Sequence, residues 1–200
     1  MKKTTDLIIP KPSGKQVEYY YDKWEKLENY QLQEKALDKL FFSLCPDNNE
    51  MSNILLKVVA LNDFYSTHIF SVFSVAKRIQ SLTDLDKRLE QGDISAVSDI
   101  QKVTIGGVEK NFYSFATKYC SHHNPSKYPI YDRYVDKVLC FFRDCDKFAT
   151  FKTKDLKEYK RFKEVLICFK DFYGLEKYDL KQIDKYLWLL GKEYFGKNNS

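Results

Sequence analysis

The sequence predicts an all-α protein, on three observations. Glycine and proline are scarce, at 7 and 5 of 200 residues, and no proline lies between Pro46 and Pro125 or after Pro129, so helices can run through most of the chain. Apolar residues recur at steps of three and four, the spacing of one helix face. The clearest series is Tyr159, Phe162, Leu166, Phe169 and Tyr173. Sustained alternation, the pattern of half-buried strands, is absent, and Gln101–Ile105 is the one short strand candidate.

The same periodicity places the elements in order along the chain. We expect helices at residues 17–29, 31–44, 50–61, 66–80, 83–91, 94–102, 108–121, 131–144, 153–173 and 179–195. Gly174 lies between the last two, where a glycine commonly ends a helix. Residues 1–15, which contain Pro10 and Pro12, are expected to form an extended arm. We expect a single helical domain over 16–200, with a division into two helical lobes as the alternative.

Composition restricts the class of protein. The 44% hydrophobic and 30% charged fractions are typical of a globular chain and exclude a disordered one. No apolar run approaches the roughly 20 residues that span a bilayer, and the first residues are too few for a signal peptide. We therefore expect a cytoplasmic protein without membrane contact, and a monomer. The net charge of +5 permits a nucleic-acid partner without requiring one.

The cysteines and histidines give no metal-binding pattern. Five cysteines occur without a CxxC pair, whereas zinc and iron–sulfur sites use thiolates at short spacing. His122 and His123 are adjacent, and neighbouring residues point apart on a helix. We expect neither a metal nor another cofactor, and we interpret the cysteines as reduced, buried side chains.

The stretch from Phe112 to Val135 carries the chemistry that the sequence suggests. Lys118 lies between Ala116 and Tyr119 on an apolar helix, where desolvation favours a nucleophilic amine. After Pro125 and Pro129, Asp132 opens the next helix, where backbone N–H groups keep a carboxylate ionised. Both residues also have a purely structural interpretation, Asp132 as an N-cap and Lys118 as a buried stem with its ammonium reaching water.

This stretch resembles the active-site hairpin of the helix-hairpin-helix DNA glycosylase superfamily, and most of all its 8-oxoguanine DNA glycosylase-like branch. Ser114–Lys118 is similar to the lysine end of the family motif, and Tyr128–Val135 is similar to its aspartate end. The match is tight over 114–135 and loose over about 50–195. Two features depart from the family: Phe115-Ala116-Thr117 replaces a Gly-x-Gly turn that grips a DNA phosphate, and the Lys118–Asp132 spacing of 14 is short.

The resemblance implies that the partner is double-stranded DNA and that the substrate is a nucleotide rotated out of the duplex. Lys118 would attack C1′ as the damaged or modified base leaves, with β-lyase activity as a further option. Asp132 would stabilise the positive charge on the sugar. The base-pocket candidates are Tyr119, His122, Tyr131 and Trp188, and the candidates for contacts with the DNA backbone are Lys127, Arg133 and Lys137.

Two other functions compete with this one. A catalytically silent helical module that binds nucleic acid or protein would use the same basic faces and leave Lys118 and Asp132 structural. A helical nuclease or toxin ranks lower, because the sequence has no convincing set of metal-binding carboxylates.

Overall fold

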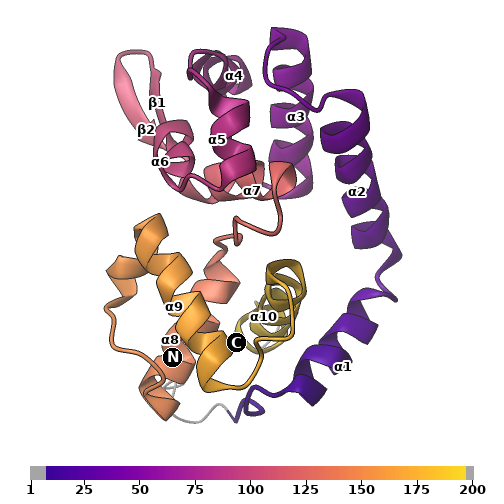
Figure 1. Ribbon diagram of the computed structural model, residues 1–200, viewed down its shortest axis with the longest axis vertical. Coiled ribbons are helices and arrows are strands. Elements are labelled where there is room, and N and C mark those ends of the chain that lie inside the picture. Colours follow the sequence, from indigo (N-terminus) through magenta and orange to yellow (C-terminus); the bar gives the residue numbers. More distant parts are fainter. Residues whose placement is uncertain (1–7, 197–200) are drawn as a thin grey trace. The chain divides into compact units, whose positions relative to one another are not determined.

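The computed structural model describes residues 8–196, and within them the chain is mostly helical, which confirms the helical class (Figure 1). One antiparallel sheet, formed by β1 (Lys102–Ile105) and β2 (Val108–Asn111), is the exception. The helices are α1 (Gly14–Trp24), α2 (Glu28–Lys39), α3 (Met51–Phe64), α4 (Val72–Gln80), α5 (Leu85–Gln91), α6 (Ser95–Gln101), α7 (Tyr113–His123), α8 (Arg133–Asp146), α9 (Tyr159–Phe172) and α10 (Leu180–Phe195). A π-helical turn at Leu40–Leu44 and a 3-10 turn at Thr153–Lys157 complete the described elements.

The contacts divide the chain into two units. Unit 1 contains residues up to Leu27 and from Tyr131 onward, and unit 2 contains Glu28–Ile130. Unit 1 therefore joins α1, from the start of the chain, to α8, α9 and α10, from its end. Of the predicted N-terminal arm, residues 1–7 lie outside the described residues. Helix α1 begins at Gly14, so the last two residues of the predicted arm, Gly14 and Lys15, are helical.

Unit 1 is held together by α10, which packs against both α1 and α8 (Figure 1). The crossing of α10 with α8 requires a glycine. A Cβ atom at Gly191 would lie 2.7 Å from the backbone oxygen of Tyr134, closer than the backbone can accept. The predicted apolar face of α9 is confirmed, since Phe162 and Phe169 are fully buried. Gly174 ends this helix with φ of +64°, as predicted.

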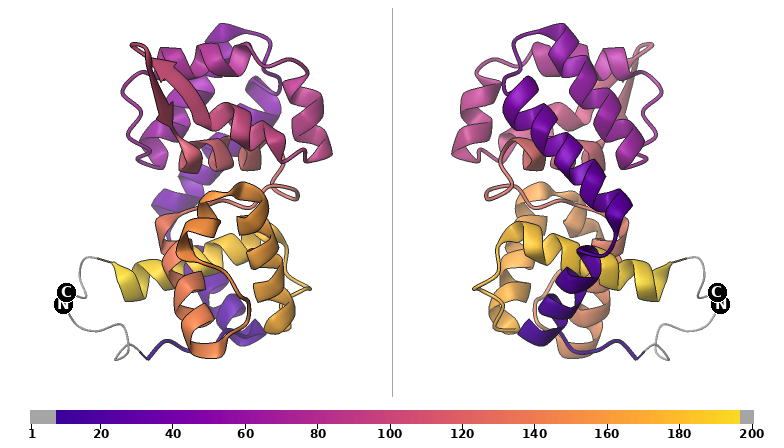
Figure 2. Two further views of the ribbon diagram at one scale, coloured as in Figure 1. Left: turned by 90° about the vertical axis from the view of Figure 1, so that its left-hand side faces the viewer. Right: turned by 90° about the vertical axis from the view of Figure 1, so that its right-hand side faces the viewer.

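Unit 2 surrounds a core of aliphatic side chains from α3, α4 and α6, including Ile54, Val75 and Ile100. Its hairpin pairs Lys102 with Asn111 and Ile105 with Val108, and Figure 2 shows it at the edge of the unit. Gly106 and Gly107 form the two-residue turn with positive φ at both positions, which favours glycine. The strand candidate is thus confirmed. The predicted helix over 108–121 is wrong in its first residues, which form β2, and α7 begins at Tyr113.

Three further helices depart from their predicted bounds, and the one expected over 17–29 runs from Gly14 to Trp24. The helix expected from 66 begins at Val72, because residues 66–69 form a loop in which Ser66 and His68 have positive φ. The Asn62 side chain stabilises this loop through hydrogen bonds with Thr67 and Ile69, a polar constraint that the spacing of apolar residues does not reveal. The helix expected over 153–173 is broken at Glu158, whose extended backbone separates a 3-10 turn from α9.

No helix within residues 8–196 combines the length and the apolar character needed to cross a membrane.

Candidate functional site

The two units share the predicted site residues between them. Unit 2 contains Lys118, Tyr119, His122 and Lys127, and unit 1 contains Tyr131, Asp132, Arg133, Lys137 and Trp188. The site is therefore described as two sets of side chains, each within its own unit.

Lys118 is buried, as its apolar neighbours predict. Its side chain lies on α7 and the residue is 2% exposed. The Nζ atom donates a hydrogen bond of 2.6 Å to the hydroxyl of Ser114, one turn earlier on the same helix. It also lies 5.2 Å from the centre of the Tyr65 ring, a cation–π contact. The amine is thus held at a defined place on α7, between the Ser114 hydroxyl and the Tyr65 ring.

Tyr65, which sequence reasoning missed, links Lys118 to His122. It follows the last residue of α3, and its hydroxyl lies 2.9 Å from Nε2 of His122. His122 is 8% exposed, whereas Tyr65 is 37% exposed. Lys118 and His122 therefore meet around one tyrosine whose ring reaches the surface of unit 2. Nothing in the local sequence marks Tyr65, because its role depends on the packing of α3 against α7.

Tyr119 belongs to the core, so the prediction that it lines a base pocket does not match its place in the structure. It is fully buried, and its ring is enclosed by Phe41, Phe115 and His123. Its hydroxyl donates a hydrogen bond to Oδ1 of Asn48, and burial raises the pKa of Tyr119. Both sides of α7 are covered by other helices, which leaves this ring no face for a base.

A second buried amine, Lys57, was also missed. Lys57 lies on α3, is fully buried, and donates 2.7 Å hydrogen bonds to the backbone oxygen of Asp47 and to Oδ1 of Asn48. Nε2 of His123 is 3.3 Å away. Burial lowers the pKa of Lys57 to about 8, and it also lowers the pKa of His123, with Lys57 adding to the effect. The apolar neighbours of Lys57 carry the same signal that identified Lys118.

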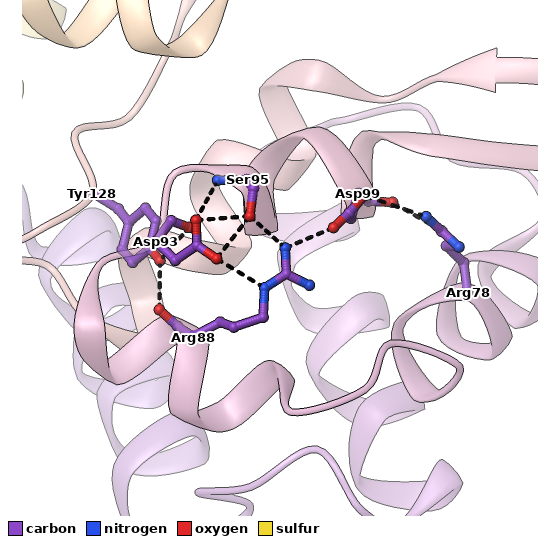
Figure 3. Close-up of polar contacts among 6 residues, drawn as sticks. All are labelled: Arg78, Arg88, Asp93, Ser95, Asp99 and Tyr128. Carbon is purple, nitrogen blue, oxygen red and sulfur yellow. Dashed lines mark hydrogen bonds and ion pairs between the residues drawn. The ribbon is translucent and has the colours of Figure 1, made fainter.

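The segment after α7 is fixed to the loop between α5 and α6. The Tyr128 hydroxyl donates to the backbone oxygens of Arg88 and Asp93, at 3.1 and 2.9 Å (Figure 3). The exposed Lys127 places its aliphatic stem against Gly92, where an added Cβ would lie 2.9 Å from that of Lys127. Asn124 donates to two carbonyls at the end of α5. These contacts hold the chain that leads from Lys118 toward Asp132.

Asp132 opens α8, as predicted. Its Oδ1 accepts a 2.8 Å hydrogen bond from the backbone N–H of Tyr134, and its backbone is extended, so it is the N-cap of the helix. The N-terminus of a helix favours a negative charge by its dipole and its unpaired N–H groups. Asp132 is half-buried.

Trp188 lies beside the start of α8. Its ring centre is 6.5 Å from that of Tyr134, two residues after Asp132, and 6.0 Å from that of Trp24 on α1. Trp188 is half-buried, and Nζ of Lys192 lies 4.8 Å from its ring centre. Unit 1 thus brings the predicted carboxylate and one predicted aromatic side chain to the same end of α8.

The other predicted residues of unit 1 differ in exposure. Tyr131 is 4% exposed and donates a 2.5 Å hydrogen bond to Oδ2 of Asp136, with Lys157 against its hydroxyl. Like Tyr119, it is a core residue, and its predicted place in a base pocket does not match this burial. Arg133 and Lys137 are exposed, over the rings of Tyr134 and Phe195, and both are free to meet solvent or a ligand on that side.

Within residues 8–196, no three His, Cys, Asp or Glu side chains gather in a way that could hold a metal ion.

Comparison with known proteins places the chain among relatives. The family HI_0787_N, described as an N-terminal domain, matches residues 16–127, a range that includes Lys118 and ends before Asp132. A Haemophilus influenzae protein, named only as an uncharacterized protein, is 53% identical over 154 residues, which cover 77% of this chain and 74% of the relative. No solved structure matches the chain.

Proposed function

The chain belongs to the HI_0787_N N-terminal domain family, and we propose that it is a DNA glycosylase with a helix-hairpin-helix glycosylase-like fold. It removes a damaged or modified base from a nucleotide rotated out of duplex DNA. Lys118 is the nucleophile, and Asp132 assists it by electrostatic stabilisation.

One observation carries this proposal. The carboxylate that the resemblance implies, Asp132, is the N-cap of a helix, and the aromatic side chain of Trp188 packs on the next residues of that helix. A carboxylate at a helix start beside a large ring provides charge for a cationic sugar and a surface for a base. The proposed nucleophile, Lys118, is buried on α7.

In the proposed reaction, the Nζ lone pair of Lys118 forms a bond to C1′ of the extruded nucleotide. The bond from C1′ to the base breaks, and its electron pair leaves with the base, which takes up the proton that the amine loses on bonding to C1′. Ser114 holds the amine through its hydroxyl, and Asp132 lowers the energy of the positive charge on the sugar. Opening of the sugar ring then gives a Schiff base between Lys118 and C1′.

Trapping with borohydride tests the proposal, because borohydride reduces a Schiff base to a stable adduct. The full-length chain is incubated with duplexes that each contain one damaged or modified base, and protein–DNA adducts are separated on denaturing gels. We expect an adduct with at least one duplex, and its loss in Lys118→Ala. Lys57→Met is the matched control, since it removes a second buried amine of unit 2 and should leave the adduct unchanged wherever the variant is folded.

Each result decides between the functions. Base release without any adduct would exclude Lys118 as nucleophile. Binding of DNA without base release, in wild type and in Lys118→Ala alike, would favour a catalytically silent binding module. Asp132→Asn should retain DNA affinity while slowing base release by about a hundredfold or more, because the electrostatic stabilisation acts in the transition state.

A further inference from the structure

Unit 2 contains a basic concavity that none of the predicted site residues lines. It has a volume of about 550 Å³ and opens beside helix α4 and the β1–β2 hairpin, which pack against each other. Its cationic side chains are Lys77, Arg78 and Lys102, and its hydroxyls are those of Ser74, Ser81 and Thr104. Positive charge and hydroxyl donors on one surface are what a phosphate group requires.

The Arg78 guanidinium is fixed in place by the neighbouring helix. Its Nε donates a 2.8 Å hydrogen bond to the backbone oxygen of Asp99. The Asp99 carboxylate lies 3.8 Å from Arg78 but only 2.6 Å from Arg88, which also binds Asp93 (Figure 3). Asp99 is therefore engaged mainly by Arg88, and the charge of Arg78 is only partly neutralised on the side of the concavity.

The two lysines carry the rest of the charge. Lys77 and Lys102 are exposed, and within residues 8–196 neither forms an ion pair with a carboxylate. Glu109, on β2, is the acidic residue of the lining. Three cations thus face one acid, which leaves a net positive surface.

The shape of the concavity indicates the source of the phosphate. Sites for small molecules enclose most of their ligand, whereas this concavity is open and its two lysines, Ser81 and Thr104 are exposed. Such a surface suits a segment of a long polyanion. The residues that replace the glycine turn of the resembled motif, Phe115, Ala116 and Thr117, are buried inside α7, so that position offers no phosphate anchor.

We propose that the concavity between α4 and the hairpin binds phosphodiester groups of duplex DNA, through Lys77, Arg78 and Lys102. The identity of the polymer as DNA rests on the proposed function. The inference that this is a phosphate site rests on the charge and shape of the concavity in unit 2.

The test measures equilibrium binding of a fluorescent, undamaged duplex to the full chain at several salt concentrations. Lys77→Ala combined with Lys102→Ala should weaken binding about tenfold or more at low salt. It should also reduce the slope of log affinity against log salt by about 2, since each phosphate contact contributes about 0.9. Lys35→Ala combined with Lys87→Ala is the control, because both are exposed lysines of unit 2 outside the concavity and the change in net charge is the same.

A variant that is expected to bind the duplex more tightly controls for loss of binding by misfolding. Glu109→Gln removes the acid of the lining and should tighten duplex binding two- to threefold, which an unfolded variant does not do. Equal loss in the two lysine pairs, or no duplex binding by the wild type, would overturn the proposal. Displacement of the duplex by low concentrations of inorganic phosphate at matched ionic strength would identify a site for small anions and would also overturn it.

The outcome is independent of the glycosylase assay. If no base is released or trapped but the lysine pair of the concavity weakens binding selectively, the phosphate site stands and the proposed enzyme activity fails. If adducts form but the two lysine pairs behave alike, the activity stands and this site fails.

Discussion

Lys57 and Lys118 are both buried amines on helices of unit 2, yet their surroundings differ. Lys57 is enclosed by three polar groups, the Asp47 carbonyl, the Asn48 amide oxygen and the His123 ring. Lys118 donates a hydrogen bond to the Ser114 hydroxyl and lies over the face of Tyr65, whose ring is partly exposed. A lysine on an apolar helix face can form part of the core, as the contacts of Lys57 show, and we propose that Lys118 serves chemistry instead.

The largest expected effect is on stability at Lys57. Lys57→Ala removes a fully buried side chain, takes the donor from the Asp47 carbonyl oxygen and leaves Oδ1 of Asn48 with only one of its two donors, the Tyr119 hydroxyl, so we expect a loss of about 3–4 kcal/mol in the free energy of unfolding. Lys118→Ala should cost only about 1–2 kcal/mol. Urea denaturation of both variants measures the difference. An equal loss of unfolding free energy in the two variants would mean that the two lysines do not differ in their contribution to stability.

The pH dependence of Lys57 gives the next effect. Its pKa is lowered from 10.5 to about 8 in the folded chain, so above pH 8 the unfolded chain binds more protons than the folded one. Stability therefore rises with pH in this window, and below pH 8 the cost of burying the charge is present in full. Relative to Lys57→Met, wild type should gain about 2–3 kcal/mol between about pH 7 and pH 10.

Measuring both proteins at each pH cancels the titration of groups that they share, such as the buried tyrosines. A constant difference between wild type and Lys57→Met across this range would mean that Lys57 has an ordinary pKa.

A smaller effect is expected at Tyr119. Tyr119→Phe keeps the ring but removes the hydroxyl that donates to Asn48, and should lower the free energy of unfolding by about 1–2 kcal/mol. Base release should be unchanged, because the ring belongs to the Lys57 region of the core. A large change in the rate of base release at unchanged stability would indicate that Tyr119 lines the base pocket.

The smallest effect is expected at Ser114. Ser114→Ala removes the hydroxyl that accepts from the Lys118 amine and should cost about 0.5–1 kcal/mol in stability. Adduct formation should slow severalfold, since the amine loses its fixed position. Ser114→Thr, which keeps a hydroxyl, should restore the rate. If the rate is the same in all three proteins, Ser114 does not position Lys118.

The sequence predicted what depends on local pattern. The helical spacing located α8, α9 and α10, and the position of Asp132 after two prolines predicted its role at a helix start. The apolar neighbours of Lys118 predicted its burial. Local pattern failed at residues 66–71, where Asn62 holds a loop that has helical spacing, and at β2, whose four residues are all exposed and show no alternation of burial.

The site was harder to predict because its contacts join distant parts of the chain. Tyr65 meets Lys118 and His122 only through the packing of α3 on α7. Tyr119 could not be assigned to the core from its spacing, since an aromatic ring has the same sequence signal in a core and in a pocket. Lys57 had the signal that was used for Lys118, and its different role comes from a loop that brings Asp47 and Asn48 to it.

Mapping the trapped adduct tests the central claim most directly. Wild-type chain and reactive duplex are reduced with borohydride, the DNA and protein are digested, and mass spectrometry locates the modified lysine. We predict that the sugar remnant lies on Lys118. A remnant on Lys57 or on any other lysine would contradict the account.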